Sequence, residues 1–295
     1  MAIENISGLY CNRNITIGDE VETDSNQPDL KELEELWALL NKHGEALRLA
    51  EKESRFEDML HLLDDLNDAL PSDLSFNPFA SSPLVQPLAL FARLDLLFRK
   101  STLHEKLGQM ELALEDVDQV TQVLQTNNIP LDLDTYHNHS ALRRGALLLT
   151  LGRGEEAIDT LRNHQPKDTA TVLLYRFLEQ KLHVSLLTNQ LPTEKSAESL
   201  FMAGRYEEAE RLLEGSSYQQ LLRAASLTML GRIEEAREVR KKEALDKYYL
   251  DEEFRPEYSM LLILHGDLPD PLPWNYDTWE SFYHFPLKTY WNLFS

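Results

Sequence analysis

The sequence predicts an all-α protein built from stacked helical hairpins, which together form an α-solenoid. The main observation is a repeated phrase in which an alanine follows a glycine after five residues, with glutamates in between. The phrase occurs at Gly152 with Ala157, Gly204 with Ala209, Gly231 with Ala236 and, in a looser form, Gly108 with Ala113. A second observation is that apolar, helix-forming residues precede these glycines, as in residues 221–230. Repetition of this kind is typical of architectures in which each unit packs on its neighbours.

Each part of the phrase has a role in the turn of a helical hairpin. A glycine just past a helix end adopts the left-handed conformation that closes the last turn. Glutamates in the first turn of the next helix interact favourably with the helix dipole. The alanine faces the preceding helix, where its small side chain lets the two backbones approach closely. The phrase therefore predicts a helix–turn–helix unit at each copy.

The first helices are expected to follow an acidic, poorly structured lead at residues 1–28. Asp29 is the expected N-cap, and apolar residues recur at helical spacing from Leu30 to Leu40. A further pair of helices is expected at residues 44–54 and 56–70.

A stretch rich in proline and serine interrupts this pattern at residues 71–87. Its prolines exclude regular helix. The stretch contains Phe76 and Phe79, so we expect this loop either to pack on the helices or to contact a partner. Apolar helices are expected next, at residues 88–107 and 109–125.

The later helices are expected at residues 141–164, 168–188, 193–213 and 217–249. The second of these ranges lacks the repeated phrase. The final helix carries a basic patch made of Arg237, Arg240, Lys241 and Lys242. Glutamates lie between these residues, which predicts a salt-bridged, solvent-exposed face rather than a nucleic-acid site.

The C-terminal segment, residues 250–295, departs from the pattern and is rich in aromatic residues. Nine aromatic side chains lie between residues 274 and 294, among them Trp274, Trp279 and Trp291. Two roles stay open. The segment either covers an apolar end of the solenoid, which such arrays require, or forms a recognition surface, since Trp and Tyr are frequent in binding hot spots.

The repeated phrase resembles the tetratricopeptide repeat family. The unit that fits best spans residues 141–166, with Gly145 in the first helix, Gly152 at the turn, and Ala157 and Leu161 in the second helix. A degenerate copy at residues 54–59 lacks the glycine. The turns at positions 54, 108, 152, 204 and 231 are 54, 44, 52 and 27 residues apart, against about 34 in regular arrays.

The resemblance implies a right-handed α-solenoid of irregular hairpins over residues 29–249 that binds a protein or peptide in a groove. The first helix of each pair lines such a groove. The groove-lining residues implied here are Arg143, Arg144, Tyr175, Arg176 and Arg223. Their arginines suit an acidic peptide or a C-terminal carboxylate.

Composition excludes some classes of function. The formal net charge is −21, which disfavours binding to nucleic acid because phosphate backbones repel such a chain. No apolar stretch of about 18 residues or secretory signal is found, so no membrane association is expected. Cys11 is the only cysteine, which excludes an internal disulfide and suits the cytoplasm.

The sequence offers little catalytic or metal-binding chemistry. No phosphate-binding loop, nucleophile elbow or zinc-protease motif occurs. The best metal candidate combines Asp132, Asp134, His137 and His139, but the favoured interpretation is an acidic N-cap region in which Asp134 caps the helix that starts near Thr135. We therefore expect no enzymatic activity and no cofactor.

Three functional hypotheses follow. The first is a noncatalytic scaffold or adaptor that binds a protein or peptide. The second is an inhibitor, immunity protein or secretion chaperone that neutralises a basic protein, because the net charge is −12 over residues 1–73 and −6 over residues 250–295. The third, an enzyme or effector on a helical scaffold, has no motif in its support.

Overall fold

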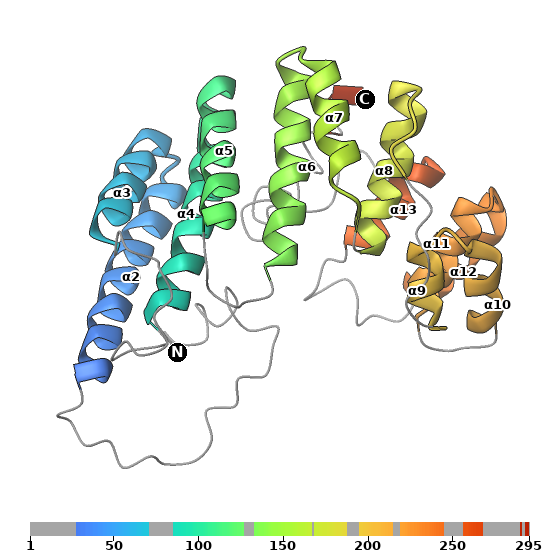
Figure 1. Cartoon of the computed structure of the whole chain (residues 1–295), viewed down its shortest axis with the longest axis horizontal. Coiled ribbons are helices and arrows are strands. Elements are labelled where there is room, and N and C mark those ends of the chain that lie inside the picture. The colour runs from blue at the N-terminus through green and yellow to red at the C-terminus, as the bar shows by residue number, and fades with distance from the viewer. Residues whose placement is uncertain are drawn as a thin grey trace. The chain divides into compact units, whose positions relative to one another are not determined.

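The computed structural model describes residues 28–70, 85–126, 133–166, 168–187, 195–214, 219–244, 256–267, 290 and 293–294. The regular structure in these residues is entirely α-helical, in twelve helices (Figure 1). The predicted all-α helical repeat is therefore confirmed, whereas the right-handed sense of the solenoid stays a prediction. The described residues do not include the lead at residues 1–27, Phe76, Phe79, Asp132 or the three C-terminal tryptophans.

The helices belong to two compact units. The first unit contains α2 (Pro28–Lys52), α3 (Phe56–Ala69), α4 (Val85–Lys106) and α5 (Met110–Thr126). The second contains α6 (Asp134–Thr150), α7 (Gly154–Asn163), α8 (Thr169–Leu182), α9 (Ala197–Met202), α10 (Tyr206–Leu213), α11 (Gln220–Met229), α12 (Ile233–Ala244) and α13 (Pro256–His265). Successive helices pack as hairpins, namely α2 with α3, α4 with α5, α6 with α7, α9 with α10 and α11 with α12 (Figure 1).

The hairpin turns share one hydrogen-bond pattern. At the turn between α6 and α7, the Gly152 N–H donates to the Leu149 carbonyl at 3.0 Å, and the Arg153 N–H donates to the Leu148 carbonyl at 2.8 Å. This pair of bonds is the Schellman motif, which satisfies the carbonyls at the end of a helix. All four glycines of the repeated phrase have φ between 74° and 76°, the left-handed conformation that this motif requires.

The residue after each turn glycine begins the next helix. Arg153 is the N-cap of α7, and its guanidinium donates to both carboxylate oxygens of Glu156 at 2.7 Å. Arg232 pairs with Glu235 in the same way, at 2.7 and 2.6 Å, and Arg205 pairs with Glu208. These pairs are exposed, so each contributes little to stability, but they give these three hairpins the same local start.

The alanine of each phrase is fully buried. Ala113, Ala157, Ala209 and Ala236 each have an exposed fraction of 0%. A larger side chain at such a position forces the two helices apart, because protein interiors are close-packed. The small side chain therefore sets the close approach within each hairpin.

The degenerate copy makes the same turn without glycine. The Ser54 N–H donates to the Glu51 carbonyl at 2.9 Å, the Arg55 N–H donates to the Ala50 carbonyl at 2.9 Å, and Ser54 has a φ of 54°. A left-handed residue with a Cβ is strained by about 1–2 kcal/mol. The first unit therefore contains a turn that is less stable than its glycine-containing counterparts.

We expect Ser54→Gly to raise the free energy of unfolding of the first unit by about 1 kcal/mol, because glycine adopts a positive φ without strain. The measurement is urea denaturation followed by circular dichroism, with Ser54→Ala as the control. Ser54→Ala keeps the Cβ and should give no gain. An equal midpoint for the glycine variant and the wild type would contradict the prediction.

Three elements differ from the sequence prediction. The helix α4 begins at Val85, inside the stretch 71–87 whose prolines were expected to exclude helix, because Pro87 lies in its first turn, where a missing N–H costs no intrahelical hydrogen bond. The helices expected to be separate around Gly44 form the single helix α2, because Gly44 does not adopt the positive φ of the turn glycines and an internal glycine costs only about 1 kcal/mol. In addition, α13 lies in the segment that was expected to be a non-repeat aromatic region. It ends in a sixth turn of the same type at Gly266, which has a φ of 68°.

The helix without the repeated phrase, α8, has its own start signal and its own packing partner. The Asp168 carboxylate caps α8 by accepting from the Thr171 N–H at 2.8 Å. The helix α13 packs against α8, α11 and α12. The second unit therefore combines regular hairpins with a helix, α8, whose partner comes from much later in the chain.

Candidate functional site

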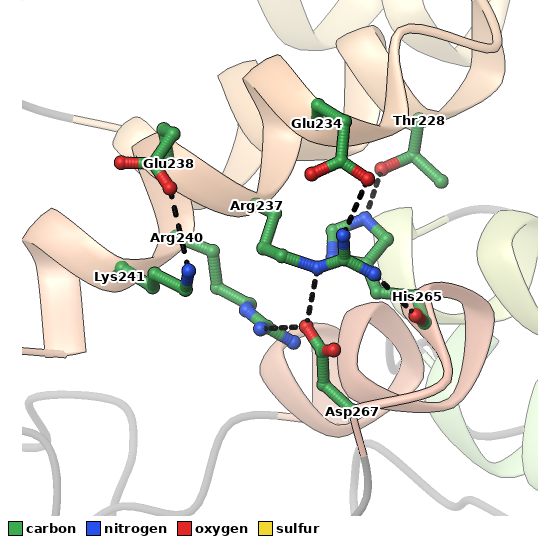
Figure 2. Close-up of polar contacts among 8 residues, drawn as sticks. All are labelled: Thr228, Glu234, Arg237, Glu238, Arg240, Lys241, His265 and Asp267. Atoms are coloured by element: carbon green, nitrogen blue, oxygen red, sulfur yellow. Dashed lines mark hydrogen bonds and ion pairs between the residues drawn. The ribbon is translucent and has the colours of Figure 1, made fainter.

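A cluster of charged side chains joins the last hairpin to the end of α13 (Figure 2). We call it the latch cluster, and it consists of Thr228, Arg237, Arg240, His265 and Asp267. Thr228 lies on α11, the two arginines lie on α12, and the other two residues lie at the end of α13. The cluster thus brings together residues from three helices of the second unit.

Two arginines hold one carboxylate. The Arg237 Nε donates to Asp267 Oδ2 at 2.8 Å, and one terminal nitrogen of Arg240 donates to the same oxygen. The other Arg237 nitrogens donate to the His265 carbonyl at 2.7 Å and to Glu234 Oε1 at 2.5 Å (Figure 2). Charge-assisted bonds of this kind are about twice as strong as neutral ones.

Local sequence explains how these groups meet. Arg237 and Arg240 are three residues apart on α12, so they share one face of the helix. Gly266 closes the turn after α13, and the Asp267 N–H donates to the Leu262 carbonyl at 3.0 Å. This turn fixes the Asp267 backbone and so presents its carboxylate to α12.

Burial sets the protonation states in the latch cluster. Burial and the nearby Arg240 charge lower the pKa of His265 to about 4, so this ring is neutral at pH 7. Burial acts to raise the pKa of Asp267, but the hydrogen bonds from Arg237 and Arg240 outweigh it and the net shift is downward. The cluster at neutral pH therefore contains two cations, one anion and one neutral imidazole.

The imidazole is only partly satisfied. His265 Nε2 lies 2.9 Å from Thr228 Oγ1, whereas Nδ1 is buried with no hydrogen-bond partner in the described ranges. The exposed fraction of His265 is 6%. A proton added to this ring would place a third positive charge beside two arginines, so the cluster is sensitive to acid.

The cluster has the chemistry of a structural staple. Its groups are arginine, carboxylate, hydroxyl and a neutral imidazole, and each arginine is engaged with Asp267. Among the described residues, no three His, Cys, Asp or Glu side chains are placed to hold a metal ion together. The arrangement holds α13 against α11 and α12.

A second ion cluster lies between α10 and α11. Glu210 is buried and accepts from Arg223 Nε at 3.2 Å and from a terminal Arg223 nitrogen at 3.1 Å. Arg232 lies 3.7 Å from the other oxygen of Glu210. This cluster joins the hairpin of α9 and α10 to the hairpin of α11 and α12.

Comparison with known families supports the repeat assignment. The family model described as "Tetratricopeptide repeat" matches residues 197–214. These residues form α9, the turn at Gly204 and the helix α10. This hairpin is a tetratricopeptide-like repeat. No curated protein and no solved structure matches it.

The second unit buries two of the residues that were expected to bind a partner. Arg143 has an exposed fraction of 1% and Tyr175 of 0%. The Tyr175 hydroxyl donates to the carbonyls of Leu161 and His164 at 2.9 and 2.6 Å, so it ties α8 to the end of α7. Both side chains therefore belong to the core of the second unit.

The other three arginines have accessible surface. Arg176 is exposed and lies 3.6 Å from Glu179, and Arg223 is half-buried beside Glu210. Arg144 is half-buried and donates to Thr160 Oγ1 at 2.6 Å. Their role in binding stays a prediction.

The basic patch of α12 is divided between two environments. Lys241 and Lys242 are exposed, as the sequence predicts, and Lys241 pairs with Glu238 at 3.3 Å. Arg240 has an exposed fraction of 3% and points to Asp267, and Arg237 is half-buried there (Figure 2). The expectation of a wholly solvent-exposed face was wrong, because α13 covers the side that carries these arginines.

Sequence reasoning missed His265 and Asp267. A signal was present, since residues 256–267 contain an apolar run followed by Gly266, like the first helix and turn of the other hairpins.

None of the helices in the described ranges combines the length and the apolar character that a membrane span requires.

Proposed function

We propose that the chain is a noncatalytic interaction scaffold or adaptor whose tetratricopeptide-like repeats bind a protein or peptide. The observation that carries the proposal is the set of hairpins with one turn geometry, one of which matches the family model. Repeats of this family generally bind proteins or peptides. The proposed function needs no cofactor, and it involves neither nucleic acid nor membrane.

We propose the cytoplasm as its location, because a chain with a single cysteine forms no internal disulfide and suits a reducing compartment. The proposed contact residues are Arg144, Arg176 and Arg223. Arg176 is the most favourable of these for an acidic peptide, because its side chain is 46% exposed and lies 3.6 Å from Glu179, a separation beyond hydrogen-bond length. A partner carboxylate that forms a bidentate pair with this guanidinium replaces a weak contact with a stronger one.

We expect Arg176→Glu to weaken binding of the partner by roughly ten-fold, because an attractive charge contact becomes a repulsive one. The tagged wild-type chain first captures and identifies the partner from native cell extract. Isothermal titration calorimetry with the purified partner then compares the variants.

The matched control is Arg211→Glu, the same charge change at an exposed position of α10 outside the proposed contact residues. Equal affinities for the Arg176→Glu and Arg211→Glu variants would contradict the proposed binding surface.

A second candidate function is an acidic inhibitor or chaperone that neutralises a basic protein. It is favoured by the row of exposed carboxylates along α3 in the first unit, which comprises Glu57, Asp58, Asp64, Asp65 and Asp68. Attraction of this kind acts mainly through long-range charge and weakens steeply with salt. The same calorimetry at low and high salt separates the two candidates, because a neutraliser loses affinity for its partner as salt is added. Its affinity should also fall with Asp65→Lys and should not change with Arg176→Glu.

A further inference from the structure

Three residues near the C-terminus dock onto the second unit. Tyr290, Leu293 and Phe294, which we call the anchor, pack against the same buried cluster as α6, α7 and α8. We call the residues that receive them the docking site, and these are Leu142, Gly145, Leu161, Phe177 and Lys181. Residues 268–289 connect the anchor to α13.

Tyr290 fits a space that only a glycine leaves open. Its hydroxyl donates to the Leu142 carbonyl at 2.7 Å, and its exposed fraction is 0%. A Cβ on Gly145 would lie 2.8 Å from this hydroxyl and 3.0 Å from Leu161 Cδ2. Burial raises the pKa of Tyr290 well above its usual value, so the hydroxyl keeps its proton and remains a donor.

Phe294 makes the second part of the contact. Its ring meets Phe177 edge to face, with centroids 5.9 Å apart and planes at 79°. Lys181 Nζ donates to the Phe294 carbonyl at 3.3 Å and lies 5.5 Å from the Phe177 ring centroid. Lys181 therefore binds both the backbone of the anchor and the aromatic ring beneath it.

The contact between the anchor and the docking site depends on a short sequence. A tyrosine, then a leucine and a phenylalanine three and four residues later, supply the hydroxyl and the apolar contacts described above. The anchor contacts described above are all made with α6, α7 and α8, so the contact has the form of a receptor with a peptide ligand.

We propose that the docking site is a recognition site for a Tyr-x-x-Leu-Phe segment, and that a second copy of this chain can supply that segment in exchange for the chain's own. The contacts of the anchor are the same whichever copy provides it, which makes such an exchange a low-cost route to a dimer. Covalent attachment makes binding of the chain's own anchor intramolecular, so the site is self-occupied at low protein concentration. The inference stands independently of the arginine surface proposed above.

Complementation between two full-length variants tests the proposal. Tyr290→Ala with Phe294→Ala leaves the docking site open and disables the anchor. Gly145→Ala blocks the site and keeps the anchor. We expect each variant alone to sediment as a monomer and the equimolar mixture to form a one-to-one dimer. The mixture is measured at about 100 μM, a concentration well above the dissociation constant of an ordinary peptide complex. A mixture that stays monomeric at this concentration would overturn the proposal.

A peptide measurement covers the case in which Gly145→Ala disturbs folding. A fluorescein-labelled peptide of residues 286–295 should bind the open-site variant and bind the wild-type chain at least ten-fold more weakly, because the wild-type anchor competes. A peptide with Phe in place of Tyr290 should bind about five-fold more weakly than the native one, since it lacks the bond to Leu142. No binding to the open-site variant, or equal binding to the wild type, would overturn the proposal. Its failure would leave the effect of Arg176→Glu on partner affinity unchanged, so the two outcomes are distinguishable.

Discussion

Asp267→Asn should lower the free energy of unfolding of the second unit by about 2–3 kcal/mol. The substitution keeps the size of the side chain and removes the negative charge that Arg237 and Arg240 share. The Arg240 side chain is only 4% exposed, so it is left as a buried cation without its carboxylate. Losing one partner of a buried ion pair costs about 3–5 kcal/mol, and the partial exposure of Asp267 reduces this.

Chemical denaturation gives the free energy of unfolding, and hydrogen exchange of the α13 amides locates the loss. The matched control is Glu234→Gln, which removes the other carboxylate bound to Arg237. Glu234 is 83% exposed, so its removal should cost less than about 0.5 kcal/mol. A second test is to add Arg240→Met to the Asp267→Asn chain, which should recover part of the loss because the buried cation that had lost the Asp267 carboxylate is gone. Equal effects of Asp267→Asn and Glu234→Gln would show that the latch cluster does not hold α13.

Acid should destabilise the second unit through His265. The pKa of His265 is about 4 in the folded protein, below the ordinary histidine value of 6.5. At pH values between about 4 and 6.5 the unfolded chain binds more protons than the folded chain. The free energy of unfolding therefore rises with pH across this range and falls as the pH drops from about 6.5 towards 4. The loss at its full extent is about 3 kcal/mol, since each pKa unit corresponds to about 1.4 kcal/mol.

The comparison variant is His265→Gln, which keeps a neutral polar side chain near Thr228 and cannot take up the proton. Urea unfolding at several pH values from 7 to 4 should give a shallower pH dependence for this variant than for the wild type. The pKa of Asp267 is lowered, so its own contribution is lost only at still lower pH and does not account for the difference. Parallel pH profiles for the two chains would contradict the assignment to His265.

The sequence predicts the hairpins well because their turns depend on local chemistry. The glycine, the capping residue and the buried alanine of each turn lie within a few residues of one another, so their spacing is visible without a structure. Ser54 shows the limit of the pattern, since it makes the same turn with a strained φ and no glycine. The helix α2 shows another, because Gly44 lies inside it and is not among the glycines with a positive φ.

The latch cluster and the anchor were not predictable in the same way. Arg237 and Asp267 are 30 residues apart, and Tyr290 is 148 residues from Leu142. No periodic pattern links residues at such separations. The burial of Arg143 was missed for a related reason, since a helix that is covered on several sides gives no clear polar face.

The separation between Tyr290 and its docking site has a consequence for synthesis of the chain. The hairpin turns close with contacts over a few residues, so each hairpin forms soon after it leaves the ribosome. The space beside Gly145 is filled only when Tyr290 has been made, after more than a hundred further residues. Until then the side chains of Leu161 and its apolar neighbours lack the Tyr290 side chain that covers them. The nascent second unit is therefore open to chaperones or to a neighbouring nascent chain for as long as translation takes to reach the anchor.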